Sequence, residues 1–407
     1  MLSGSTSRAV PRVQQWQTDD DSICPLLCNS KISIVKNPDD GAGQRGHGMK
    51  FSRVWVAAGT ILVCCLTGWA QQKRKIVIDQ DAAGPAGTDQ QSMLLLIQSP
   101  QAEVLGITVV TGDQWLHEEV AHTLRMLELI GRTDIPVVPG AEYPLVRRKP
   151  EMEQWEEQFG FVPWLGAWTP KYFHPAEQLG EMPEGKPATK PDGEDAAHFL
   201  LRMVHQFPHE VSIYEGGPMT NLALAISIDP EFAGLAKELV FMGGSFNPRT
   251  DDPEFAHTPT HEFNLWFDPE AAHIVLGAPW KKIVCTPVDI SVKTRLTSDL
   301  ITRIKASDSP AARYIGKYAR LRGNYNYLWD ELAAAAWLDS SLITKKETVY
   351  MDVDLDRGAG YGNTLSWTER DKPKLAVQPV EVQDDLDLDK FYKMFVELLS
   401  AHTPREN

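Results

Sequence analysis

The feature that most constrains the fold is a regular alternation of short apolar segments with longer helical ones. The apolar segments are continuous, as in KIVID (75–79), EVLGITVV (103–110) and ELVFM (238–242). Strands that are buried on both faces have such sequences, and the helical segments between them supply the cover. The pattern therefore predicts an α/β fold with a mostly parallel central sheet flanked by helices.

The beginning of the chain has a different character. Residues 49–70 combine a basic start (Lys50 and Arg53), an apolar run of 13 residues at 54–66 and a Gly-Trp-Ala sequence that ends at Ala70. This is the pattern of a secretory signal peptide, and 13 apolar residues are fewer than the roughly 20 that span a bilayer. We therefore expect cleavage near Ala70, an exported (periplasmic or secreted) protein and no stable membrane anchor.

The signal divides the chain into three parts. Residues 1–48 are rich in Gly, Ser, Asp and Asn without a sustained period, which predicts disorder or a mis-called extension upstream of the true start. Residues 71–407 are expected to form one domain. Within it, the segment 145–193 is rich in Pro, Trp and Gly and shows no period. Its many aromatic residues argue against disorder, so we interpret it as a lid-like insertion.

Charge and cysteine content exclude some classes of protein. The net charge of −15 argues against a nucleic-acid partner held by phosphate contacts. Cleavage near Ala70 would leave Cys285 as the single cysteine. An internal disulfide is then impossible, and the exported domain must be stable through its core alone.

Acidic and polar residues gather where the predicted elements end or begin. In chain order these positions carry Asp79, Asp81, Asp89, Asp113, Thr220 and Asp330. Parallel α/β sheets place their sites outside the carboxyl ends of strands. Carboxylates that converge there repel one another unless a cation neutralises them. Oxygen ligands alone favour a hard ion, Ca²⁺ or Mg²⁺.

Five motifs, in order from about Lys75 onward, resemble those of the inosine–uridine-preferring nucleoside hydrolase family. They are DQDAAGPAGTDQQSMLLLIQSP, GPMTNLALAI, FMGGSF, HEFNLWFDPEAAHIVL and WDELAAAAWL. One such motif would be weak support, whereas five in family order are strong. The resemblance implies a Rossmann-like nucleoside hydrolase architecture and hydrolysis of the N-glycosidic bond of ribonucleosides to free base and ribose.

The resemblance also implies a set of roles around one Ca²⁺. Asp81 would be metal ligand and general base, Asp89 and Asp330 would be carboxylate ligands, and Thr220 would bind the ion through its backbone carbonyl. Asp79 would support the same loop. A bound Ca²⁺ lowers the pKa of its water and orients the ribose diol, and Asp81 would take the water's proton.

The family's substrate-binding positions carry over in the same way. Glu262 and Asn264 would bind ribose hydroxyls, and Met242 would line the pocket beside the sugar. A small-molecule nucleoside is thus the implied partner. We also expect a homo-oligomer, whose size the sequence leaves open.

Four features depart from the family pattern. Thr88 stands where the family has the first Asp of a pair, and AAGPAG is inserted before it. A hydroxyl can still bond a ribose OH, but it carries no charge. Asp113 replaces the usual Asn and Trp329 the usual His. The last two changes resemble the purine-preferring branch, in which a Trp stacks on the base. Such stacking is worth about 1–3 kcal/mol. Trp164 or Trp168 could supply a second face.

Each assignment has a simpler alternative. The first Asp cluster could cap a helix, Asp113 could be a turn residue, Trp329 could be packing and Glu262 could cap a loop. For the whole chain, the alternative is a divergent member that binds a ribosyl ligand with lost or changed catalysis. Retention of every ligand position favours the enzyme, whereas Thr88 and the inserted loop favour divergence.

Overall fold

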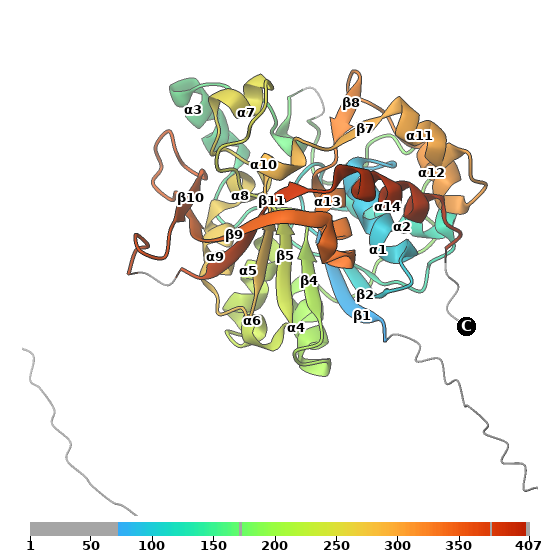
Figure 1. Ribbon diagram of the computed structural model, residues 1–407, viewed down its shortest axis with the longest axis horizontal. Coiled ribbons are helices and arrows are strands. Elements are labelled where there is room, and N and C mark those ends of the chain that lie inside the picture. The colour runs from blue at the N-terminus through green and yellow to red at the C-terminus, as the bar shows by residue number, and fades with distance from the viewer. Residues whose placement is uncertain (1–71, 171–172, 375–376, 404–407) are drawn as a thin grey trace, which may run out of the picture. The chain divides into compact units, whose positions relative to one another are not determined.

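The computed structural model describes residues 72–170, 173–374 and 377–403. The predicted extension, the signal peptide and its cleavage point lie outside these residues. In the described part of the chain, a nine-stranded sheet has the order β10-β9-β11-β6-β5-β4-β1-β2-β3 (Figure 1). Its strands are β1 (Arg74–Gln80), β2 (Ala102–Val109), β3 (Val137–Pro139), β4 (Ser212–Glu215), β5 (Glu238–Met242), β6 (Ile283–Thr286), β9 (Ile343–Val353), β10 (Thr364–Trp367) and β11 (Pro379–Leu386).

The seven neighbouring strands from β11 to β3 run parallel, which confirms the predicted fold class. Only β9 and β10 are antiparallel to their neighbours. These two strands lie outside the predicted pattern. The sequence of β9, ITKKETVYMDV, carries exposed charged residues and lacks a continuous apolar run, and β10 has only the four residues TLSW. They cover one edge of the sheet and are not enclosed by helices on both faces.

Helices cover both faces of the sheet (Figure 1). The described helical elements are α1 (Thr88–Gln98), α2 (Leu116–Ile130), α3 (Lys149–Phe159), η1 (Gly166–Trp168), α4 (Ala196–Gln206), α5 (Thr220–Ile228), α6 (Phe232–Leu235), α7 (Pro253–His257), α8 (Phe263–Phe267), α9 (Pro269–Gly277), α10 (Val288–Ser291), α11 (Ser298–Lys305), α12 (Pro310–Tyr318), α13 (Trp329–Leu338), η2 (Ser340–Leu342) and α14 (Leu388–Ser400). Between α10 and α13, β7 (Arg295–Thr297) and β8 (Tyr325–Tyr327) form a two-stranded ribbon. None of these helices combines the length and apolar content that crossing a membrane requires.

Two apolar cores lie on opposite faces of the sheet, as the pleat of a strand dictates. In β5, Val240 and Met242 join the core formed with α1, α2, α13 and α14. Leu239 and Phe241 alternate with these residues along the strand, and they join the core formed with α4, α5, α6 and α9. A strand buried on both sides requires apolar residues at successive positions, which explains the continuous apolar sequences.

The segment 145–193 contains more regular structure than its sequence predicts. Helix α3 begins beside Pro150 and buries only Met152, so its apolar period is too weak to detect. A third apolar cluster then attaches the segment to the domain. Within it the ring of Trp168 packs 4.5 Å from that of Phe267, measured between centroids. The lid interpretation stays a prediction, but its aromatic residues do order the segment.

Candidate active site

A cavity of about 740 Å³ opens beyond the carboxyl ends of the parallel strands. Nine of the ten predicted ligand and substrate-binding residues line it: Asp81, Thr88, Asp89, Asp113, Met242, Glu262, Asn264, Trp329 and Asp330. They come from segments as much as 249 positions apart in the sequence (81 to 330). The topology of the sheet therefore brings the predicted set together, apart from Thr220.

Asp81 lies directly after β1 and is held against the end of β2. The backbone N–H of Asp113 donates to Asp81 Oδ2 at 3.1 Å. A Cβ atom at Gly112 would lie 1.9 Å from the same oxygen. Only glycine permits this close approach, so Gly112 and Asp81 form one unit that joins the two neighbouring strand ends.

Asp330 faces Asp81 from the first turn of α13. Gln80 Nε2 donates to Asp330 Oδ2 at 3.2 Å, and the hydroxyl of Tyr214 donates to the Asp330 backbone carbonyl at 2.8 Å. Asp330 Oδ1 is buried without a hydrogen-bond partner in the described structure. Gln80 and Tyr214 are site residues that the motif analysis missed. Gln80 lies between Asp79 and Asp81 in the sequence. That position was the one signal that could have identified it as a site residue.

The carboxyl groups at this end of the cavity disfavour one another's ionisation. Burial, followed by repulsion from neighbouring carboxylates including Asp113 and Asp330, raises the pKa of Asp81 well above its usual range. Burial and the charge of Asp89 likewise raise the pKa of Asp330 well above its usual range. Burial also raises the pKa of Asp113 to about 7. A bound cation would reverse these shifts, because it favours the ionised forms.

The donor set fits a hard cation by its chemistry. Asp81, Asp89 and Asp330 offer only oxygen, and Asp330 Oδ1 has no other described partner. The described residues do not contain three or more His, Cys, Asp or Glu side chains already arranged as a metal-binding group. The assignment of Ca²⁺ ligands therefore rests on the donors and their charge.

Thr220 does not line the cavity through its side chain. It begins α5, and its Oγ1 donates to Asp268 Oδ2 at 2.7 Å. Asp79 likewise lies behind the cavity, where its Oδ1 accepts from Asn221 Nδ2 at 2.9 Å. The supporting role of Asp79 in the loop stays a prediction. Binding of a metal by the Thr220 carbonyl stays a prediction.

Glu262 both caps a helix and lines the cavity. As N-cap of α8 it accepts from the backbone N–H groups of Asn264 (2.7 Å), Leu265 (3.0 Å) and Gly244 (3.0 Å). Asn264 Nδ2 donates to the Met242 carbonyl at 3.1 Å. The simpler capping interpretation is therefore correct for Glu262, and it does not exclude a ribose contact. We call Asp81, Asp89, Glu262, Asn264 and Asp330 the cavity floor.

A second group of cavity-lining residues carries mostly aromatic and charged side chains. We call Trp164, Glu254, Arg322, Tyr327 and Trp329, all of which line the cavity, the cavity roof. Trp164 Nε1 donates to Asp113 Oδ1 at 2.6 Å. The Arg322 guanidinium lies 4.2 Å from the centroid of the Trp164 ring. The structure thus places Trp164 at the cavity, whereas Trp168 is buried in the aromatic cluster described above.

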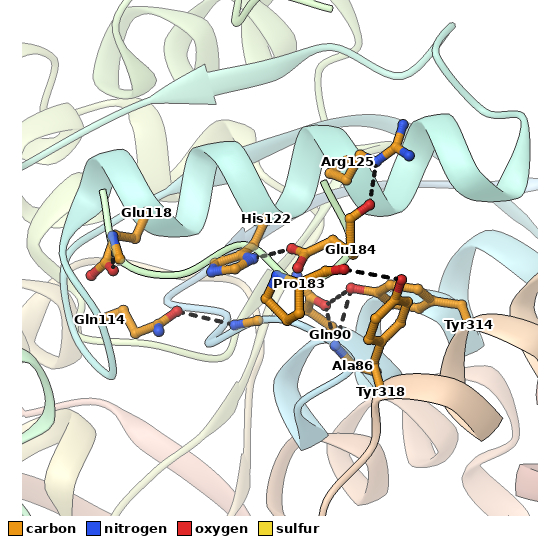
Figure 2. A network of polar contacts seen from close by, with 12 residues as sticks. Ala86, Gln90, Gln114, Glu118, His122, Arg125, Pro183, Glu184, Tyr314 and Tyr318 are labelled. Atoms are coloured by element: carbon orange, nitrogen blue, oxygen red, sulfur yellow. Dashed lines mark hydrogen bonds and ion pairs between the residues drawn. The ribbon is translucent and has the colours of Figure 1, made fainter. Parts of the chain in front are cut away.

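The inserted loop between β1 and α1 is held in an unusual conformation. Ala86 has a positive φ of 55°, which is uncommon for a residue other than glycine. Its N–H donates to Gln90 Oε1 at 2.8 Å and to the Tyr314 hydroxyl at 3.0 Å (Figure 2). The Gly84 N–H donates to Gln114 Oε1 at 3.1 Å. These bonds fix the loop that precedes Thr88 and Asp89.

The same network ties the segment 145–193 to the cavity edge. Glu184 lies against His122 of α2, and both side chains are buried (Figure 2). Arg125 Nε donates to the Glu184 carbonyl at 2.9 Å, and the Tyr318 hydroxyl contacts the Pro183 carbonyl at 3.4 Å. Pro183 itself lines the cavity. The segment is therefore attached at the cavity as well as through its aromatic cluster.

A parallel α/β sheet with an acidic cavity beyond its strand ends defines a broad class of proteins, and comparison narrows it to one family. Residues 76–393 match the family model described as inosine-uridine preferring nucleoside hydrolase. The chain belongs to this family.

Individual relatives agree with that assignment. The inosine-uridine preferring nucleoside hydrolase of Leishmania major is 27% identical over 339 residues, covering 80% of this chain and 97% of the relative. A probable uridine nucleosidase 1 of Oryza sativa subsp. japonica is 26% identical over 343 residues, covering 80% and 97%. A solved plant nucleoside hydrolase superposes with a TM-score of 0.65 at 25% identity, covering 81% of this chain and 99% of the other. The first name specifies inosine and uridine, the second specifies uridine, and the third specifies no base.

Proposed function

We propose that this chain is a Ca²⁺-dependent ribonucleoside hydrolase that prefers purine nucleosides and releases free base and ribose. One observation carries the proposal: the acidic residues of the floor and the aromatic residues of the roof line the same cavity. The reaction must generate a cation-like sugar, activate a water and release a base. Family membership supports the hydrolysis of ribonucleosides in general.

Asp81, Asp89 and Asp330 would hold Ca²⁺, together with the carbonyl of Thr220. The ion would supply a water of lowered pKa and two coordination positions for the ribose diol. Asp81, positioned by Gly112 and the Asp113 N–H, would accept the proton of the attacking water. Asn264 and Glu262 would orient the ribose and thereby reduce the entropic part of the barrier.

The positions of Trp329, Trp164 and Asp113 at the cavity support the preference for purines. Trp329 offers a half-buried ring at the cavity, and Trp164 offers a second, fixed by its bond to Asp113. A purine has the larger π-surface for two such faces. The proposal includes a lid role for the segment 145–193, supported by Trp164 and Pro183 at the cavity.

A reducing-sugar assay on inosine, guanosine, adenosine, uridine and cytidine, with and without chelator, tests the proposal. We expect calcium-dependent turnover that is fastest with purines. Faster turnover of uridine would contradict the preference for purines. Thr88, a cavity residue without charge, favours the second candidate, a divergent ribosyl-binding member. Binding of ribose without turnover of any nucleoside would support that candidate.

We also propose that the protein is exported. The support is the signal pattern at 49–70, which lies outside the described residues. The native protein should begin at Gln71, which mass spectrometry of its N-terminus would show. Peptides from residues 1–48 in that sample would contradict both the cleavage and the proposed start at Met49.

A further inference from the structure

Helix α7 brings an acidic side chain to the roof that neither the motifs nor the proposed roles account for. Asp252, Glu254 and Phe255, at its N-terminal end, all line the cavity. Glu254 is half-buried, and among the described residues its carboxylate makes no hydrogen bond or ion pair. A carboxyl group directed at a cavity without a protein partner is available to a ligand.

The contacts of α7 place this short helix beside Trp329, the proposed stacking face for the base. The ring of Phe255 packs edge-on against Trp329, with centroids 5.4 Å apart. The Tyr327 hydroxyl contacts Asp252 Oδ2 at 3.3 Å. Glu254 directly precedes Phe255 in α7 and lines the same cavity as Trp329.

The charged groups around Glu254 leave it able to carry a proton near neutral pH. Burial and, to a smaller extent, the charge of Asp252 raise the pKa of Glu254, Arg322 opposes both effects, and the net pKa is about 7. Trp329 cannot serve as an acid, because an indole N–H is a hydrogen-bond donor only. The Asp113 carboxyl is already bonded to Trp164.

We propose that Glu254 is the acid that protonates the departing base. The inference rests on the proposed function. As the bond from C1′ to the base nitrogen breaks, its electron pair passes to the base, and the Glu254 proton is transferred to a ring nitrogen of that base. The oxygen of the attacking water bonds to C1′, and the water's proton goes to Asp81. Asp81 then releases its proton to solvent and Glu254 regains one from solvent, so that charge and atoms balance.

The test compares two substrates in wild type and Glu254→Gln. Inosine requires protonation of its leaving group, whereas 4-nitrophenyl β-D-ribofuranoside releases a stable anion. Positioned acids contribute about 10²–10⁴-fold, so kcat for inosine should fall at least about 10²-fold. The kcat for the nitrophenyl riboside should remain unchanged. Asp251→Asn, which removes an exposed carboxylate from the same loop, is the matched control and should leave both rates unchanged.

The other possible outcomes contradict either the role of Glu254 or the proposed function. Equal losses on both substrates would show that Glu254 acts on the ribose or on the fold, and unchanged inosine turnover would show that it is not the acid. Either result leaves the proposed function intact, because wild type still hydrolyses inosine. Wild-type protein that hydrolyses neither substrate would overturn the proposed function, and the role of Glu254 with it.

Discussion

The floor and the roof of the cavity differ in how their side chains are held. All five floor residues are buried, and hydrogen bonds from residues at or just after strand ends position Asp81, Glu262 and Asp330. Most roof residues are half-buried or exposed, and they contact one another mainly through rings and a guanidinium. The floor begins with Asp81 at a strand end of the parallel sheet, whereas the roof is assembled from α7, β8, the start of α13 and two loops. The reaction and the choice of base can therefore vary independently.

Removing the metal should affect the floor carboxylates and leave the roof residues unchanged. We expect a chelator to abolish hydrolysis of every nucleoside and added Ca²⁺ to restore it, because the floor carboxylates then lose the charge that compensates them. Ca²⁺ should also raise the melting temperature, since it binds the folded state. Activity that persists at full rate in chelator would contradict a metal site on the floor.

Changing one floor residue should have the next largest effect. In Asp81→Asn the amide oxygen can still accept the Asp113 N–H, so the fold should be retained. The loss of the general base should lower kcat by about 10²–10⁴-fold. Steady-state kinetics measure the loss, and an unchanged melting temperature is the control. A variant that keeps most of its kcat would show that Asp81 is not the base.

Changing a roof residue should alter the choice of base more than the reaction itself. Trp329→Ala should reduce kcat/KM for inosine by about 5- to 150-fold, from the loss of about 1–3 kcal/mol of stacking, and reduce it less for uridine. Trp329→Phe, which keeps an aromatic face, is the matched control and should retain most of the activity. Equal losses for both substrates would make Trp329 a packing residue.

The smallest effect should come from the attachment of the segment 145–193 to α2. Glu128 Oε1 accepts from the N–H groups of Ala188 and Thr189 at 2.6 and 2.7 Å. Burial alone would raise the pKa of Glu128, but bonds from Thr189 and Arg125 outweigh it and lower the pKa to about 2. Unfolded Glu has a pKa of about 4.3. The stabilisation is therefore present above that value and lost as the pH falls toward about 2.

We expect Glu128→Gln to lower the melting temperature at pH 7 by about 2–4 °C, for about 1–2 kcal/mol. The difference from wild type should shrink between about pH 4.3 and pH 2. Thermal unfolding at several pH values measures both. Glu397→Gln removes an exposed partner of Lys393 and should change neither, because such pairs contribute little. A difference that does not depend on pH would contradict the assigned pKa.

The sequence by itself determined the parts of this protein that depend on neighbours along the chain. Continuous apolar runs define strands covered on both faces, and the acids that follow them must lie at one edge of a parallel sheet. That reasoning predicted the fold class and most of the floor, including Asp81 and Asp330. The cap formed by Glu262 was one of the alternatives that the sequence left open, because a cap bonds residues two or three positions away.

Only the tertiary structure decided which side chains from distant segments meet. Trp164 and Trp168 stand in similar local sequence, yet one lines the cavity and the other packs on Phe267. Glu254 reaches the roof because α7 packs against Trp329, and no local pattern encodes that contact. Burial and pKa depend on neighbours far away in the sequence, which the chain acquires only when its strands and helices have packed.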